Sequence, residues 1–458
     1  MLSLIMCRNL LKCFGRKVKF AMCENKKNSV SIRNFFFIFL VAFDVFQTVI
    51  AARMDYTYGA GSEFSDNAGL VSVDEVNDTI IKTFVGGSYY EDSAAVNSDV
   101  RLMLENSNYV NDTFADQLFL SLSADVNWTI RPSSFFWSLE NYFLQAERDV
   151  LDVATPNNLI NTNAFSTGPD FIFRIDSVHS LLLSTRLSSY KFEDSNANSN
   201  RGSMLASWKH DLSAESEISL NATFMDVKYE DLEDIADFSR NDIFVNFNMQ
   251  YFESSIDLSI GKTFINREID GDIDGGLAKF IWINQFRSQS YFRVDLISKY
   301  SDSGIDLLNT DASGLSLNVS GGQVNADIFY DKRLNARYHI NSGFSGFNIY
   351  FTYRDEDYEI LLRDRNIKLA GLNYNYAYTT RIQLIADAYF SKIDNIDADQ
   401  LDDLTVFNMF LNYRISRNVS FSSGYRFSEQ ASNVETSEFT ENRVMFSLYY
   451  GRNIQSYR

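Results

Sequence analysis

Cysteine, proline and histidine are scarce in this chain of 458 residues. The three cysteines (Cys7, Cys13 and Cys23) all lie within the first 23 residues, so the rest of the chain is neither a disulfide scaffold nor a cysteine-type zinc protein. Three prolines suit long paired strands, because proline cannot donate the N–H that a sheet requires. G-x-S-x-G, P-loop and H-E-x-x-H motifs are also absent, and we therefore expect neither catalytic residues nor a cofactor.

A basic excess is lacking as well. The chain has 41 Lys and Arg against 60 Asp and Glu, a formal net charge of −19, and no basic stripe stands out along it. Nucleic-acid binding needs clustered positive charge, so nucleic acid is not an expected partner.

Long apolar runs are missing except near the start. Residues 35–51 are apolar, follow Lys26, Lys27 and Arg33, and lead to small residues, which is the pattern of a secretory signal peptide. We assign residues 1–52 to it, with Met22 as an alternative start, because residues 22–34 would form an ordinary basic leader. An N-terminal membrane anchor is the other interpretation, although the run is short for one and Asp44 interrupts it. Removing this segment takes away eight basic and two acidic residues and leaves a net charge of −25.

What the sequence has in abundance is alternation. In "DIFVNFNMQYF" (242–252), Ile243, Val245, Phe247, Met249 and Tyr251 share one face of a strand, and Asp242, Asn246, Asn248 and Gln250 share the other. The same period of two recurs in residues 118–128, 291–300, 381–390 and 443–450, and 39 Phe and 25 Tyr add to the strand preference. The chain after residue 52 is therefore predicted to be all-β.

The links between these runs alternate in length. Short ones at 253–255, 287–289, 378–381 and 416–418 are interleaved with long polar ones at 146–168, 228–240, 301–322 and 392–403. Short turns on one rim and long loops on the other are typical of outer-membrane barrels. We therefore predict a transmembrane antiparallel β-barrel of about 18 strands, within a range of 16–20, over residues 53–451. Residues 452–458 would form a periplasmic overhang. A soluble β-sandwich is the alternative, but its strands are shorter and its inner face more apolar.

Charged residues on the polar faces are the candidate lumen lining. They are Arg293, Asp295, Lys299, Arg337, His339, Arg381, Asp387 and Arg443. A lumen of mixed sign predicts no strong cation preference, with the acidic excess in the outer loops. Lys262 falls on the apolar face unless a bulge near Gly261 reverses the alternation.

Four stretches resemble a known family: "YGAGSEFSDNAGL" (58–70), "DIFYDKRLNARYHI" (327–340), "IYFTYRDEDYE" (349–359) and "RVMFSLYYG" (443–451). The chain resembles the β-barrel porins often found beside bacterial exopolysaccharide gene clusters. The resemblance implies a location in the outer membrane and a role in polysaccharide export or general permeation. The partners it implies are outer-membrane lipid and lipopolysaccharide, the barrel-assembly machinery and polysaccharide export components.

Two chemical alternatives remain open. "DGDIDGG" (270–276) places Asp270, Asp272 and Asp274 at the first, third and fifth positions of a calcium loop, although the glutamate expected at the twelfth position is replaced by Ile281. An outer-membrane hydrolase would need a serine–histidine pair, for which His339 is the candidate. The rival to a channel is a structural or adhesive barrel plugged by residues 301–322.

Overall fold

Twenty strands form the part of the chain that can be described. The computed structural model describes residues 52–230, 237–267, 271–287, 289–308 and 326–451. The strands of the first half are β1 (Arg53–Ser65), β2 (Asp78–Asp92), β3 (Val96–Tyr109), β4 (Gln117–Arg131), β5 (Phe135–Glu147), β6 (Leu159–Arg174), β7 (His179–Phe192), β8 (Ser199–Ser213), β9 (Ser216–Tyr229) and β10 (Phe238–Tyr251).

The second half continues in the same way. Its strands are β11 (Ser254–Arg267), β12 (Ile273–Arg287), β13 (Ser290–Asp302), β14 (Ile328–Asn341), β15 (Ser345–Tyr358), β16 (Arg365–Ala377), β17 (Ile382–Asn395), β18 (Gln400–Arg414), β19 (Val419–Ser432) and β20 (Phe439–Gly451). Short helical segments are η2 (Pro156–Asn158), α3 (Ser303–Leu308) and η3 (Glu435–Ser437). No helix in the described ranges has the length and apolar character needed to cross a membrane.

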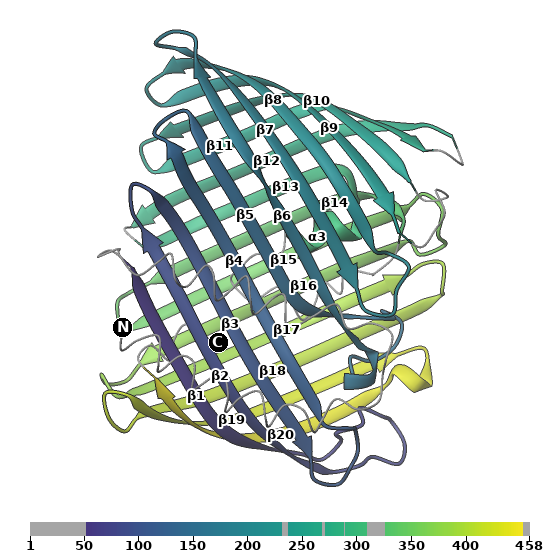
Figure 1. The fold of residues 1–458 in the computed structure, drawn as a ribbon. Coiled ribbons are helices and arrows are strands. Elements are labelled where there is room, and N and C mark those ends of the chain that lie inside the picture. Colours follow the sequence, from purple (N-terminus) through teal and green to yellow (C-terminus); the bar gives the residue numbers. More distant parts are fainter. Residues whose placement is uncertain (1–51, 231–236, 268–270, 288, 309–325, 452–458) are drawn as a thin grey trace, which may run out of the picture. The chain divides into compact units, whose positions relative to one another are not determined.

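Every strand pairs antiparallel with its neighbours in sequence, and β1 pairs with β20, so that the sheet closes on itself (Figure 1). The closing register runs from Thr57 opposite Gly451 to Ser65 opposite Arg443. Closure gives every strand two partners and leaves no exposed sheet edge. The predicted all-β antiparallel barrel is confirmed, and its 20 strands stand at the upper end of the predicted range.

The two faces of the sheet reverse the usual distribution of polarity. Large apolar side chains point outward and are exposed, as Ile243 and Val245 do on β10, whereas Asp242, next to Ile243, is buried on the inner face. Most of the buried residues are polar or charged. A soluble sandwich would bury the apolar face, so this arrangement excludes it.

The connections alternate as predicted. The nine turns that join even-numbered strands to the next odd-numbered strand have two to four residues, and the chain enters β1 and leaves β20 at this same rim. Nine of the ten connections at the other rim are longer, with five or more residues up to the segment 303–327 between β13 and β14, and the tenth, 396–399, has four. The loops are nevertheless shorter than the sequence suggested: 148–158, 230–237 and 396–399 replace 146–168, 228–240 and 392–403, because polar residues continue the strand ladders.

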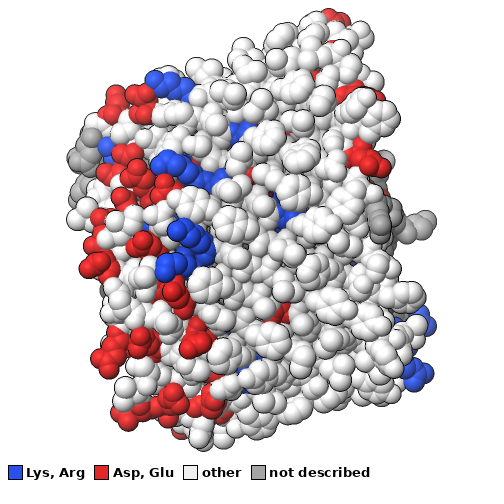
Figure 2. Space-filling model, turned by 180° about the vertical axis from the view of Figure 1, so that it is seen from behind, with Lys and Arg blue, Asp and Glu red and all other residues white. Residues whose placement is uncertain are grey.

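The loop rim is acidic. Each of its ten connections carries at least two Asp or Glu residues, and their basic residues are limited to Arg148 and Arg363. Figure 2 shows a cluster of acidic side chains along this rim, beside a wide band of the outer surface that has few charged residues. The acidic excess therefore lies in the loops, as predicted.

Lys262 corrects one detail of the prediction. Pairing of β11 with both neighbours is continuous around Gly261, so no bulge reverses the faces there. Lys262 instead points outward, where its Nζ lies 2.5 Å from a carboxylate oxygen of Asp274 and over the ring of Phe264. A charge can occupy the outer face here because this part of β11 lies towards the loop rim, where the outer face is polar.

Candidate functional site

The inner face of the barrel encloses a cavity of about 1200 Å³. Its walls come mainly from β10–β20, completed by β3–β7 and by the loops 66–77 and 148–158. Basic side chains outnumber acidic ones along it, although the whole chain is acidic. The basic ones are Arg240, Lys279, Arg293, Lys299, Arg333, Arg337, Arg354, Arg365, Arg426 and Arg443; the acidic ones are Glu147, Asp152, Asp242, Asp295, Asp331, Asp402 and Glu441.

Four buried side chains and the half-buried Arg333, on β14, β15 and β16, form an alternating ionic chain. It runs in the order Arg333, Asp331, Arg354, Glu356 and Arg365, with nitrogen–oxygen distances of 2.8, 3.0, 2.8 and 2.5 Å. Each carboxylate lies between two guanidinium groups, which is the arrangement that stabilises ions away from bulk water. The ionic chain has an arginine at each end, so its three guanidinium groups outnumber its two carboxylates and this wall carries a net positive charge.

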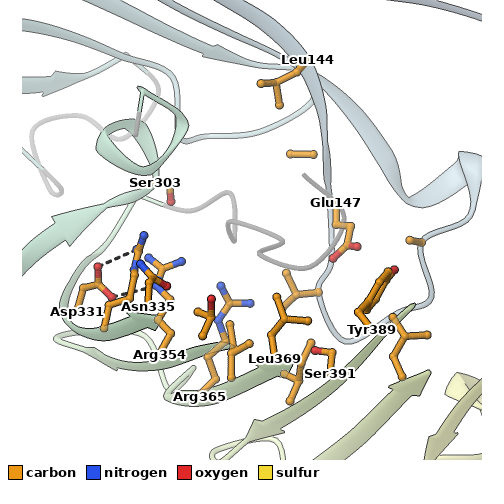
Figure 3. A pocket seen from close by; sticks show the side chains of 18 of the residues that line it. Leu144, Glu147, Ser303, Asp331, Asn335, Arg354, Arg365, Leu369, Tyr389 and Ser391 are labelled. Carbon is orange, nitrogen blue, oxygen red and sulfur yellow. Dashed lines mark hydrogen bonds and ion pairs between the residues drawn. The ribbon is translucent and has the colours of Figure 1, made fainter. Parts of the chain in front are cut away.

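Glu147 faces this ionic chain across the cavity. Figure 3 shows its carboxylate at the end of β5, on the same side as Tyr389 and away from Asp331 and Arg354. Ser303, the first residue of α3, reaches the same cavity from above. Glu147 thus adds an acidic group to the cavity opposite the Asp331 end of the ionic chain.

Helix α3 is fixed to the barrel wall by an ion pair. The Asp302 carboxylate lies 2.7 Å from Nη2 of Arg201 on β8, and both side chains are buried. The same carboxylate accepts hydrogen bonds from the backbone N–H groups of Gly304 and Ile305, and the Arg201 guanidinium also lies over the ring of Tyr190. This places α3 against the inner wall at the loop end of the barrel.

Five of the eight residues predicted to face the lumen line this cavity: Arg293, Asp295, Lys299, Arg337 and Arg443. The structure brings Arg293 and Asp295 together as an ion pair of 2.8 Å, and it places Arg337 directly opposite Arg293 on the next strand. Arg443 lies on the other side of the cavity, where it pairs with Glu441 at 2.6 Å and with Glu63 at 2.9 Å.

The other three predicted residues lie outside that lining. His339 and Asp387 are on the inner face in the row below it, where His339 stacks on Tyr291 with ring centroids 5.2 Å apart and Asp387 accepts a hydrogen bond from Asn408. Arg381 is exposed in the turn between β16 and β17 rather than in a strand, because the ladder of β17 begins at Ile382.

The candidate calcium loop is only partly described. Asp270 lies outside the described residues, Asp272 is exposed, and Asp274 belongs to β12 and forms its ion pair with Lys262. Within the described parts of the chain, no group of three or more His, Cys, Asp or Glu side chains is placed to hold a metal ion.

The sequence missed the ionic chain of β14–β16. Asp331, Arg354 and Arg365 are all buried, but most of their sequence neighbours are polar too, such as Lys332, Asp355 and Asn366, so no alternation with apolar residues marked them as inward-facing. At the loop rim, Asp327 accepts backbone N–H hydrogen bonds from Ile328, Ile360 and Leu361. Burial nevertheless raises the pKa of Asp327 above its ordinary value, because the loss of water outweighs those hydrogen bonds.

The last five strands of the barrel match a known protein family. Strands β16–β20 carry the second half of the cavity lining, including Tyr389, Arg426 and Arg443. Residues 366–451 match the family model described as "Putative beta-barrel porin 2". The resemblance to a β-barrel porin family is therefore confirmed over these strands. No curated protein matches the sequence.

Solved outer-membrane structures are similar at low identity. The siderophore receptor PirA from Pseudomonas aeruginosa is 10% identical, with 87% of this chain and 80% of that chain covered and a TM-score of 0.42. The outer membrane protein OpdK from Pseudomonas aeruginosa is 8% identical, with coverage of 87% and 99% and a TM-score of 0.35. The iron transporter FrpB from Neisseria meningitidis is 8% identical, with coverage of 87% and 81% and a TM-score of 0.43. The barrel itself is established by the strand pairing described above.

Proposed function

We propose that this protein is a porin-type diffusion channel of the bacterial outer membrane, with no catalytic activity and no cofactor. The observation that carries the proposal is the reversed polarity of the closed sheet. Its exposed face is apolar, as lipid requires, and its inner face carries the ions and amides that line a watery path. The porin family match of residues 366–451 supports the same assignment.

Charge along this path changes sign. The loop rim is acidic and repels anions at long range, whereas the cavity has more basic than acidic side chains. Opposite signs in series oppose each other, so a small cation and a small anion each meet one favourable and one unfavourable region. We therefore expect a channel without a strong preference for either sign.

Reconstitution into a planar bilayer tests both parts of the proposal. We expect discrete single-channel steps in potassium chloride and a permeability ratio of potassium to chloride within about threefold of unity, because the two charged regions offset each other. Gel mobility that changes on heating confirms in the same preparation that the barrel is closed. A folded barrel that gives no conductance would contradict the channel and favour a plugged structural or adhesive barrel.

A hydrolase is the less favoured alternative. In the described residues His339 has an aromatic neighbour in Tyr291 and makes no hydrogen bond to a serine hydroxyl or a carboxylate. A nucleophile and its base lie within hydrogen-bond reach of each other in such enzymes. Loss of an esterase activity on replacing His339 would be required to revive this alternative.

Export of a polysaccharide is the finer form of the channel proposal. The porin resemblance implies it, and the cavity wall adds hydroxyl, amide and guanidinium groups that suit a hydrated, oxygen-rich cargo. A channel for such a cargo should be blocked transiently by soluble oligosaccharides during bilayer recording.

A further inference from the structure

Three pairs of arginines lie directly opposite each other on neighbouring described strands of the cavity wall. Arg333 and Arg354 share the carboxylate of Asp331 between them. In the other two pairs, Arg293 on β13 is opposite Arg337 on β14, and Arg426 on β19 is opposite Arg443 on β20. The four arginines of these two pairs line the cavity. Like charges in directly opposed positions destabilise a sheet, so each of the two pairs raises the question of what offsets the repulsion.

In each of the last two pairs only one arginine has a carboxylate of its own among the described residues. Arg293 pairs with Asp295, and Arg443 pairs with Glu441 and Glu63. Arg337 and Arg426 form no hydrogen bond or ion pair with the described side chains, and the buried Nε of Arg426 has no hydrogen-bond partner there. Arg426 interacts with Asp387 at longer range. The guanidinium groups of Arg337 and Arg426 thus face the cavity with N–H donors that no described side chain accepts.

Two tyrosine side chains lie on the wall between Arg337 and Arg426. Along one row of direct cross-strand partners lie Arg337, Tyr350, Gly371 and Tyr389, on β14 to β17. Gly371 has a specific role, because a Cβ there would come within 2.5 Å of the tip of the Tyr350 ring and within 2.9 Å of Tyr389 Cβ. The missing side chain lets the Tyr350 ring lie against the backbone of β16. We call Arg337, Tyr350, Gly371 and Tyr389, together with Arg426 one row lower on β19, the arginine–tyrosine shelf.

The row immediately below the two tyrosines is rich in amides. Asn348, Asn373, Asp387 and Asn408 follow one another on β15 to β18 as direct partners, and Arg426 on β19 continues this row opposite Asn408. Hydrogen bonds join Asn348 to Asn373 at 2.9 Å and Asn408 to Asp387 at 2.8 Å, while the buried Oδ1 of Asn348 has no partner among the described residues. Amides offer both donors and acceptors, which is what vicinal hydroxyl groups need.

We infer that the arginine–tyrosine shelf binds an oligosaccharide that carries carboxylate groups. The tyrosine rings offer flat apolar faces to the C–H side of the sugar rings, the amide row meets their hydroxyls, and Arg337 and Arg426 hold carboxylates at the two ends. This inference rests on the proposed channel function and names its cargo class.

The spacing of the arginines selects an oligomer over a small anion. Arg337 and Arg426 are five strands apart, which at about 4.8 Å per strand is roughly 24 Å along the wall. A single sugar ring reaches one of them, whereas a chain of several rings reaches both. Asp387 lies within the span and disfavours an anion at that point, so the ligand's charges must be spaced to avoid it.

Titration calorimetry on the full chain in detergent tests this directly. The probes are linear tetragalacturonate, the monomer galacturonate and the neutral maltotetraose. Tetragalacturonate should bind more tightly than either of the others. Arg337→Gln and Arg426→Gln should each weaken its binding about tenfold, as expected for the loss of a charge-assisted hydrogen bond, and leave maltotetraose unchanged. Tyr350→Leu should weaken both oligomers.

Arg186→Gln is the matched control. Arg186 also faces the lumen, but its guanidinium is held by both carboxylate oxygens of Asp170 at 2.8 and 2.9 Å. This variant should bind tetragalacturonate as the parent does, and heat-dependent gel mobility checks that every variant is folded. Equal affinity for the acidic and neutral oligomers, equal affinity for monomer and tetramer, or an equal loss in the Arg186 variant would each overturn the shelf.

Bilayer recording separates the shelf from the channel. Conductance without tetragalacturonate binding would overturn the shelf and leave the channel standing. Binding without conductance would uphold the shelf and reject the channel.

Discussion

Arginine in place of Val245 should lower the free energy of unfolding of the barrel by about 2–4 kcal/mol, the cost of a cation on the lipid face near the bilayer midplane. Val245 lies near the middle of β10, and its direct partners Leu220 and Ile260 also present exposed apolar side chains outward. A guanidinium group there finds no water and no carboxylate among these neighbours. The measurement is urea unfolding of protein folded into vesicles, with the unheated gel mobility reporting the folded fraction.

The adjacent residue supplies the control. Asn246 lies at the same depth of the barrel as Val245 but faces the lumen, where its amide donates hydrogen bonds to Asp257 and Ser259. An arginine at position 246 can pair with Asp257, so Asn246→Arg should change stability far less. Equal losses in the two variants would show that the outer face does not meet lipid.

The second large effect is expected at Arg354. Its guanidinium joins Asp331 to Glu356 with both carboxylates almost fully buried, so Arg354→Met leaves each of them with one partner where it had two. We expect a cost near the lower end of the roughly 3–5 kcal/mol that breaking a buried ion pair costs, because each buried carboxylate keeps one arginine and loses the second that offset its burial. The same vesicle titration measures the loss.

Two further variants make the Arg354 result interpretable. Lys332→Met removes an exposed pair with Asp355 from the outer face of β14 and should cost no more than about 1 kcal/mol. Combining Arg354→Met with Glu356→Gln should cost more than Arg354→Met alone, because it also removes the carboxylate that pairs with the buried Arg365. If Arg354→Met were no worse than Lys332→Met, the ionic chain would contribute nothing beyond a surface contact.

The face of each strand could be predicted from the sequence because it depends on a period of two that any single strand displays. Ile243 and Asn246 needed no knowledge of their neighbours to be placed outside and inside. The short turns were equally readable, since 378–381 breaks the alternation where the chain reverses. The barrel therefore followed from local information.

The lengths of the strands could not be predicted from local composition. The stretch "DNIDADQLDD" (394–403) has the composition of a loop, yet β17 ends at Asn395 and β18 begins at Gln400. Backbone hydrogen bonds continue the ladder whatever the side chains are, and outside the apolar band nothing requires those side chains to be apolar. Composition therefore overestimated the loops.

The site was recoverable only in part because it depends on register. Parity identified Arg293 and Arg337 as inward-facing, but their direct opposition requires the pairing of β13 with β14. The same holds for the tyrosines of the shelf, which are 39 residues apart and become near neighbours only through Gly371. Arg381 was misplaced for a related reason, since one residue decides whether a charge ends a turn or begins a strand.

A second ionic chain crosses the seam of the barrel. It links Glu441 and Arg443 on β20 to Glu63 on β1, then to Lys82 on β2 and Glu105 on β3, with nitrogen–oxygen distances from 2.6 to 3.1 Å. Glu63 on the first strand is the carboxylate that separates Arg443 from Lys82. A barrel that closed without β1 would lose this separation and bring two cations towards each other. The first and last strands thus complete each other's charges, so a prematurely closed sheet is penalised and the full ring of 20 strands is the one that assembles.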